Sequence, residues 1–122
     1  MRFLIVDDDA RIRRMIKTVV ADETDFVFEC SDGAQANASY TEHEPDWVLM
    51  DVTMPGLDGI SATREIRSAH PTARIIIVTN HESAAMRAEA TSAGACGYVL
   101  KENLLDLREM VQGNAAVVVV AA

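Results

Sequence analysis

The sequence predicts a single doubly wound α/β domain, with helices on both faces of a five-stranded parallel sheet. Its 122 residues are the usual size of one domain, and 49% of them are hydrophobic, which is enough for one core. Short apolar runs alternate along the chain with longer segments of helical periodicity. The runs are nearly continuous Ile, Val and Leu, which is typical of strands buried on both faces of a parallel sheet.

Five apolar runs are predicted to be the strands of this sheet. In chain order they cover residues 3–6, 26–28, 47–50, 75–78 and 98–100. Each has the length of a strand, and the segments between them are long enough for a helical crossover, which parallel neighbours require.

The first helix is predicted between the first two strands. Apolar residues recur there at spacings of three and four, which is the pattern of an amphipathic helix. They are Ile12, Met15, Ile16, Val19 and Val20. The basic residues of this segment are predicted most simply to form its solvent-exposed face, which also borders the site predicted below and could meet an acidic partner helix. They are Arg11, Arg13, Arg14 and Lys17.

Four further helices are predicted from composition and from the residues that end them. They cover residues 33–43, 59–69, 82–93 and 104–112. Pro45, Pro71 and Gly94 follow three of these segments, and such residues commonly terminate helices.

Charge and composition exclude several classes of function. The formal net charge is −8, the opposite sign to that of most surfaces that bind nucleic acid or anionic membranes. We therefore expect neither direct nucleic-acid binding nor membrane association. Cys30 and Cys96 are predicted to be free thiols, and no segment has the length of a signal peptide, so a cytoplasmic location is expected. Residues 113–122 form a separate low-complexity tail, interpreted as a linker or an artificial extension.

Polar residues follow four of the predicted strands. In parallel sheets the ligand binds beyond the carboxyl ends of the strands, so these side chains are expected to share one site. They are Asp7, Asp8 and Asp9 after the first strand, Asp51 after the third, Thr79 and Asn80 after the fourth, and Lys101 after the fifth.

This set of residues predicts chemistry on a phosphoryl group. Clustered carboxylates repel one another unless a cation compensates them, and oxygen ligands without His or Cys favour Mg²⁺, with Mn²⁺ as a substitute. A metal that neutralises the carboxylates permits one of them to attack phosphorus. The Lys101 ammonium and the Thr79 hydroxyl can each hold a separate phosphoryl oxygen.

Four sequence motifs carry a resemblance to a known family. FLIVDDD, VLMDVTMPGLDG, IIIVTN and GACGYVLK occur in this order within residues 3–101. The chain resembles the response-regulator receiver domain of bacterial two-component signalling, over residues 2–112. The resemblance implies a flavodoxin-like fold with strand order 2-1-3-4-5 and a receiver domain that covers residues 1–112. It also implies a signalling domain, not an enzyme, that assists its own phosphoryl transfer and dephosphorylation.

The resemblance also implies a role for each residue of the predicted site. Asp51 would accept a phosphoryl group from a sensor histidine kinase or a histidine phosphotransfer protein. Asp7, Asp8, Asp51 and the backbone carbonyl of Thr53 would hold Mg²⁺. Thr79 and Lys101 would bind the phosphoryl group.

Tyr98 would be the aromatic switch residue, acting together with Thr79, although a plain packing role for Tyr98 stays open. The signal would leave through the surface of the fourth helix, fifth strand and fifth helix, which is also the expected homodimer interface.

The sequence departs from the family pattern in two places. Glu102 follows Lys101 where the family usually has proline, and this ending is more similar to receivers joined to a helix-turn-helix domain. It implies control of a DNA-binding output domain that this chain lacks. Asn80 stands where a small side chain is usual, and by the resemblance Thr53 and His81 flank the approach of water. Thr53, Asn80 and His81 are therefore predicted to modulate, and to slow, autodephosphorylation.

Two alternatives stay open on the sequence. A haloacid-dehalogenase-type phosphatase also has a strand that ends in Asp-x-Asp, as at Asp7 and Asp9, and one that ends in Thr-Asn. Its nucleophile would be Asp7, which leaves Asp51 without a role. The second alternative is a receiver-like interaction module that never carries phosphate.

Overall fold

The sheet has five parallel strands in the order β2-β1-β3-β4-β5, as predicted. The structure, a computed structural model, describes residues 1–112, so the predicted tail lies outside the described residues. The strands are β1 (Arg2–Val6), β2 (Phe26–Cys30), β3 (Trp47–Met50), β4 (Ile75–Thr79) and β5 (Gly97–Leu100). Their bounds match the predicted runs to within two residues.

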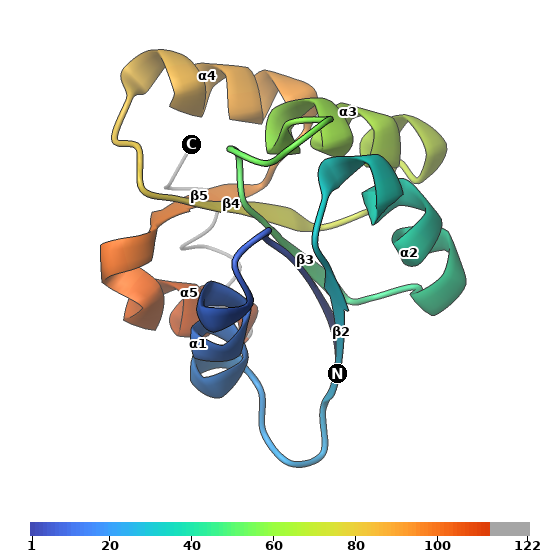
Figure 1. The fold of residues 1–122 in the computed structure, drawn as a ribbon, viewed down its shortest axis with the longest axis vertical. Helices are drawn as coiled ribbons and strands as arrows, with labels where there is room; N and C mark the ends of the chain where they lie inside the picture. Colours follow the sequence, from blue (N-terminus) through green and yellow to red (C-terminus); the bar gives the residue numbers. More distant parts are fainter. Residues whose placement is uncertain (113–122) are drawn as a thin grey trace.

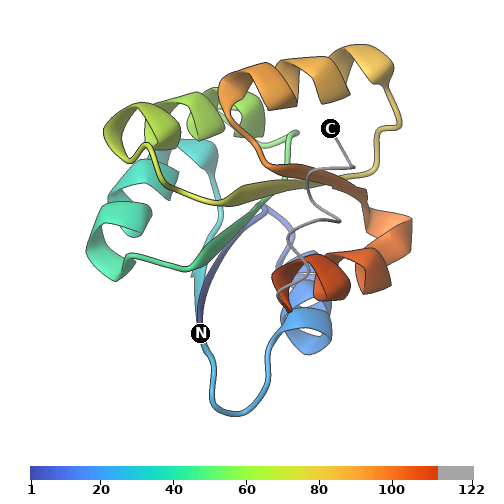
Figure 2. The same ribbon diagram turned by 180° about the vertical axis from the view of Figure 1, so that it is seen from behind.

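Helices cover both faces of this sheet (Figure 1). They are α1 (Ala10–Val20), α2 (Ala36–His43), α3 (Gly59–Ala69), α4 (Ala84–Ala93) and α5 (Leu104–Val111). Figure 2 shows from behind that α1 and α5 lie on one side of the sheet and α2, α3 and α4 on the other. Single turns of 3₁₀ helix, Gly33–Gln35 and Lys101–Asn103, lead into α2 and α5. The predicted doubly wound α/β fold is confirmed.

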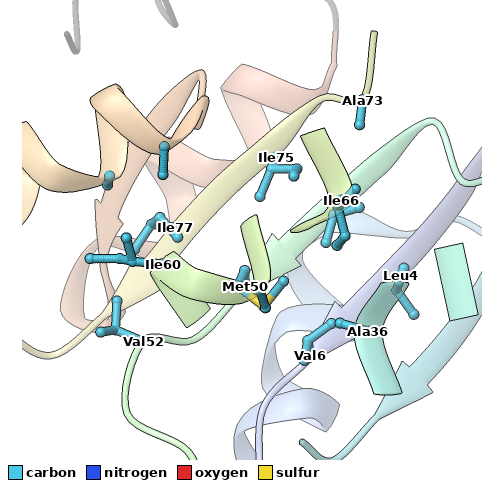
Figure 3. Close-up of a cluster of buried hydrophobic side chains, with 14 of the residues drawn as sticks. Leu4, Val6, Ala36, Met50, Val52, Ile60, Ile66, Ala73, Ile75 and Ile77 are labelled. Atoms are coloured by element: carbon cyan, nitrogen blue, oxygen red, sulfur yellow. The ribbon is translucent and has the colours of Figure 1, made fainter. Parts of the chain in front are cut away.

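Two hydrophobic clusters, one on each side of the sheet, form the core. Successive side chains of a strand point to opposite faces, so Leu4 and Val6 join one cluster while Phe3 and Ile5 join the other. Figure 3 shows the first cluster, in which Ile60 and Ile66 of α3 lie over the sheet. The central strands are therefore buried on both faces, as their apolar composition predicts.

Two apolar positions do not have the burial that the pattern predicts. Phe26 is 64% exposed because β2 is an edge strand that pairs only with β1. Met15 is 50% exposed although it lies on the apolar stripe of α1, whose buried positions are Ile16 and Val20. The stripe is wider than the contact that α1 makes with the core.

The start of α3 packs closely against the end of β3. Asp58 caps the helix, and its carboxylate accepts hydrogen bonds from the backbone N–H groups of Ile60 and Ser61. Gly59 has no side chain, and a Cβ at this position would lie 1.8 Å from the carbonyl oxygen of Asp51. This close approach fixes α3 beside the residue that ends β3.

Within residues 1–112, no helix combines the length and the apolar character needed to cross a bilayer.

Candidate functional site

Three aspartates meet at the carboxyl end of the sheet. Asp7 and Asp8 follow β1 and Asp51 follows β3, and these strands are neighbours. The backbone N–H of Asp51 donates to the carbonyl oxygen of Val6 over 2.8 Å, which extends the ladder to the site. One carboxylate oxygen from each aspartate lies within 4.8 Å of the others. Asp7 and Asp51 are buried, whereas Asp8 is exposed.

Lys101 reaches this cluster from the end of β5. Its Nζ lies 2.9 Å from Oδ2 of Asp7 and 3.2 Å from Oδ1 of Asp51. The side chain is 12% exposed, so its charge is shielded from most of the solvent. The structure therefore brings together residues that lie 94 positions apart in the sequence.

Burial and neighbouring charges shift the pKa values of these groups. Burial raises the pKa of Asp51, the charge of Asp7 raises it further, and Lys101 opposes both effects. For Lys101, burial alone lowers the pKa, but the carboxylates of Asp7 and Asp51 outweigh it and the pKa is raised. The two carboxylates therefore favour the charged form of Lys101, which pairs with both of them.

The cluster still carries an excess of negative charge, with three carboxylates and one lysine. Oδ1 of Asp7 accepts a hydrogen bond from the backbone N–H of Asp9 at 2.9 Å. Oδ2 of Asp7 is buried and meets the Lys101 ammonium as an ion pair at 2.9 Å, with no further hydrogen bond within residues 1–112. An all-oxygen donor set of this kind fits a hard divalent cation such as Mg²⁺.

Arg13 supports the cluster from α1. Its Nη1 donates to the backbone carbonyl oxygen of Asp7 at 2.6 Å, and its Nε donates to Oε1 of Glu29 at 2.7 Å. The side chain is only 16% exposed, so the prediction that Arg13 lies on the solvent face is wrong. Helical side chains point back towards the amino terminus, which brings this one over the turn after β1. No pattern in the sequence separates Arg13 from the other basic residues of α1.

Asp9 does not join the carboxylate cluster. Its side chain caps α1 by accepting a hydrogen bond from the backbone N–H of Arg11, and it pairs with the Arg11 guanidinium. The phosphatase alternative rests on the Asp-x-Asp spacing of Asp7 and Asp9, with Asp7 as the nucleophile. The cluster instead contains Asp51, for which that alternative has no role.

Thr79 and Tyr98 are connected through the backbone of one residue. Thr79 ends β4 and is fully buried, and its Oγ1 accepts a hydrogen bond from the backbone N–H of His81 at 3.2 Å. Tyr98 on β5 is 6% exposed, and its hydroxyl donates to the carbonyl oxygen of His81 at 2.6 Å. The two residues that the sequence predicts as a switch pair thus share a hydrogen-bonding partner.

The remaining predicted residues follow the ends of β3 and β4 in the chain. Thr53, Asn80 and His81 are all exposed, in the loops that follow β3 and β4. The Lys101–Glu102 peptide bond is trans, like every other peptide bond of residues 1–112.

Comparisons with known proteins agree with this geometry. A family model described as the response regulator receiver domain matches residues 3–112. The chemotaxis protein CheY of Bacillus subtilis (strain 168) is 45% identical over 101 residues, which are 82% of this chain and 84% of that protein. CheY of Thermotoga maritima is 40% identical over the same shares of both chains.

A solved structure points to the same family. A two-component response regulator of the LuxR family from Aurantimonas sp. SI85-9A1 matches with a TM-score of 0.86 and 36% identity, covering 94% of this chain and 84% of that one. The resemblance found in the sequence is confirmed, and the phosphatase alternative is wrong. The chain belongs to the family of response regulator receiver domains.

Proposed function

We propose that this receiver domain accepts a phosphoryl group on the carboxylate of Asp51. The observation that carries the proposal is the ion pair of 3.2 Å between Nζ of Lys101 and Oδ1 of Asp51, beside two further carboxylates. Lys101 opposes the rise in the pKa of Asp51 and so favours the ionised form, which is the form that a nucleophile needs. The attacking oxygen forms the new P–O bond while the bond from phosphorus to the donor breaks.

Asp51 is a better nucleophile than the other two acids of the cluster. Asp7 is completely buried, and one of its oxygens already accepts a hydrogen bond. Asp8 is exposed, and solvation weakens an attacking carboxylate. The exposure of Asp51, 5%, lies between these two extremes, and Lys101 pairs with it as well as with Asp7.

Mg²⁺ or Mn²⁺ would be held by Asp7, Asp8, Asp51 and the backbone carbonyl of Thr53. When bound, the ion would neutralise the carboxylates and the phosphoryl oxygens. Lys101 would bind one phosphoryl oxygen and the Thr79 hydroxyl another. We propose a sensor histidine kinase or a histidine phosphotransfer protein as the donor.

Thr79 and Tyr98 are the proposed switch. Movement of Thr79 towards a phosphoryl group changes its hydrogen bond to the backbone of His81, whose carbonyl holds the Tyr98 hydroxyl. The output surface is then formed by α4, β5 and α5, and it also serves as the proposed homodimer interface. Thr53, Asn80 and His81 are the proposed modulators of dephosphorylation, because they are exposed and follow Asp51 and Thr79 within two residues along the chain.

Two further parts of the proposal concern location and output. The two free cysteines, one of them buried, suit a reducing compartment, and we place the chain in the cytoplasm. The relatives include chemotaxis proteins and a LuxR-family regulator, so control of a DNA-binding output domain outside this chain stays a prediction.

Intact-mass measurement after incubation with acetyl phosphate and Mg²⁺ tests the proposed function. The wild-type chain should gain the mass of one phosphoryl group, with acetate as the leaving group, and Asp51→Asn should gain none. Chelation of the metal should abolish the gain. Undiminished labelling of Asp51→Asn would exclude Asp51 as the acceptor, and a wild-type chain that never gains mass would support the phosphate-free interaction module.

A further inference from the structure

Arg87 of α4 lies directly over the ring of Tyr98. The Cζ atom of its guanidinium is 4.4 Å from the ring centroid, which is the geometry of a cation–π contact. The same guanidinium binds both carboxylate oxygens of Glu82, with Nη2 at 2.9 and 3.2 Å from them. Arg87 is therefore held between an aromatic face and a carboxylate.

The segment from residue 81 to residue 87 thus holds Tyr98 at two points. The carbonyl oxygen of His81 accepts the hydroxyl hydrogen bond, and Arg87 covers the face of the ring. Glu82, which follows His81 directly, orients the guanidinium. One contact comes from the loop after β4 and the other from the first turn of α4, next to the proposed switch.

Elsewhere α4 offers few large side chains that could hold the ring in place. Its sequence is AAMRAEATSA, in which Met86 is the one large apolar residue. Ala84, Ala85 and Ala88 are too small to cover an aromatic face. Tyr98 belongs to the hydrophobic cluster on this side of the sheet, and Arg87 adds a contact on one face of its ring.

We propose that Arg87 and Glu82 form a clasp, made of the cation–π contact and the ion pair, that holds Tyr98 in its buried position. Both are positioning residues, since neither touches the carboxylate cluster. The clasp sets the balance between buried and exposed positions of the Tyr98 ring. Its consequence for signalling, a higher threshold for releasing the ring, rests on the proposed function, whereas the clasp itself does not.

The position of the ring is measured by ¹⁹F NMR of chains that carry 3-fluorotyrosine at both tyrosines. Tyr40 lies on α2 and provides an internal reference, and Tyr98 is assigned by comparison with Tyr98→Phe. Solvent isotope shifts then report the exposure of each ring. No phosphoryl donor is present, so the readout is independent of phosphorylation.

Arg87→Ala should raise the ratio of exposed to buried Tyr98 about fivefold, as the loss of one partly exposed cation–π contact implies. Glu82→Gln should shift the ratio in the same direction by less, and should add nothing in the Arg87→Ala background, because the two side chains act as one unit. Glu89→Gln on the same helix and Arg64→Ala on α3 change the same charges on exposed side chains and should have no effect.

An unchanged Tyr98 signal in both Arg87→Ala and Glu82→Gln would overturn the clasp. If circular dichroism shows that Arg87→Ala is unfolded, Glu82→Gln still provides the test, because it leaves the packing of α4 intact. Failure of the proposed function appears separately, as absence of the mass gain in wild-type protein, and leaves the ring measurement unaffected.

Discussion

Asp51 is a buried carboxylate, and its ionisation affects the stability of the fold. Its pKa is raised by burial and by Asp7, so the folded chain binds this proton more tightly than the unfolded chain does. Above the folded pKa of Asp51, the ionised carboxylate therefore lowers the free energy of unfolding. This destabilisation disappears when the pH falls below the usual pKa range of an aspartate, because the carboxyl group is then protonated in both states. The site residue is thus destabilising at neutral pH until a cation binds.

Replacing Asp51 should accordingly stabilise the metal-free chain. We expect Asp51→Asn to raise the free energy of unfolding by about 1 kcal/mol at about pH 7, because a buried charge beside Asp7 is removed. The gain should vanish at about pH 3, where an ordinary aspartate is largely protonated. Urea unfolding with a chelator present measures both values.

The exposed variant Glu65→Gln controls for the change in net charge. A lower stability of Asp51→Asn at neutral pH would mean that the pair with Lys101 outweighs the cost of burial.

Arg13 is the second residue whose effect can be isolated. It fixes the carbonyl of Asp7 and ties α1 to Glu29 of β2, so Arg13→Ala should loosen the turn that presents Asp7 and Asp8. We expect Mg²⁺ to bind about tenfold more weakly, as is usual when a residue that supports a ligand is removed. Isothermal titration calorimetry measures the affinity.

Arg14→Ala is the matched control, because the neighbouring side chain is exposed and should leave Mg²⁺ binding unchanged. Equal affinities of Arg13→Ala and wild type would show that the turn holds its shape without Arg13.

At the scale of elements, the contact between β3 and α3 is possible because Gly59 has no side chain. A Cβ at Gly59 would lie 1.8 Å from the carbonyl oxygen of Asp51, so Gly59→Ala must push the helix away from the strand. We expect a loss of about 1–3 kcal/mol in the free energy of unfolding, the usual range for overpacking. Thermal unfolding of Gly59→Ala and of the exposed α3 variant Ser68→Ala measures this difference.

A normal melting temperature for Gly59→Ala would mean that α3 can shift without strain. The phosphoryl label should fall together with stability, because α3 packs against the backbone of Asp51, the proposed acceptor.

The second element with a testable role is α4. Few large apolar side chains anchor it, so its backbone should open more readily than the central strands. We expect beryllofluoride with Mg²⁺, a mimic of the phosphoryl group, to change amide exchange in residues 82–112 and to leave β1 and β3 unaltered. Identical exchange with and without the mimic would contradict signal output through α4, β5 and α5.

The sequence predicts elements well where burial is uniform and less well at the periphery. The central strands are apolar on both faces, so composition alone identifies them. The exposure of Phe26 depends on which strand lies at the edge, and strand order is a property of the whole sheet. The predicted start of α4 lies two residues early because Ser83 caps the helix and its hydroxyl accepts from the backbone N–H of Met86.

For the whole molecule, topology explains why the site residues could be predicted. In the order β2-β1-β3-β4-β5, β2 lies on one side of β1 and all later strands lie on the other, so the strand order reverses between β1 and β3. The three acids follow these two neighbouring strands. The contacts of Arg13 and Arg87 could not be predicted in the same way. Each depends on how far one helix lies from a strand or a loop, and no spacing in the sequence encodes that distance.

The excess of acidic residues also has a consequence for the whole molecule. The chain has a formal charge of −8, and part of that charge is concentrated in a cluster that one lysine only partly neutralises. A bound divalent cation relieves the repulsion inside the cluster and should favour the folded state. The metal would then link the chemistry of Asp51 to the stability of the domain.

Chemical trapping of the phosphorylated residue tests the central claim most directly. Borohydride reduces an acyl phosphate on aspartate to homoserine, so peptide mass spectrometry after acetyl phosphate, Mg²⁺ and borohydride identifies the acceptor by position. We expect homoserine at residue 51 and unmodified aspartate at residues 7 and 8. Homoserine at residue 7 or 8, or at none of the three, would contradict the assignment of Asp51 as the phosphoacceptor.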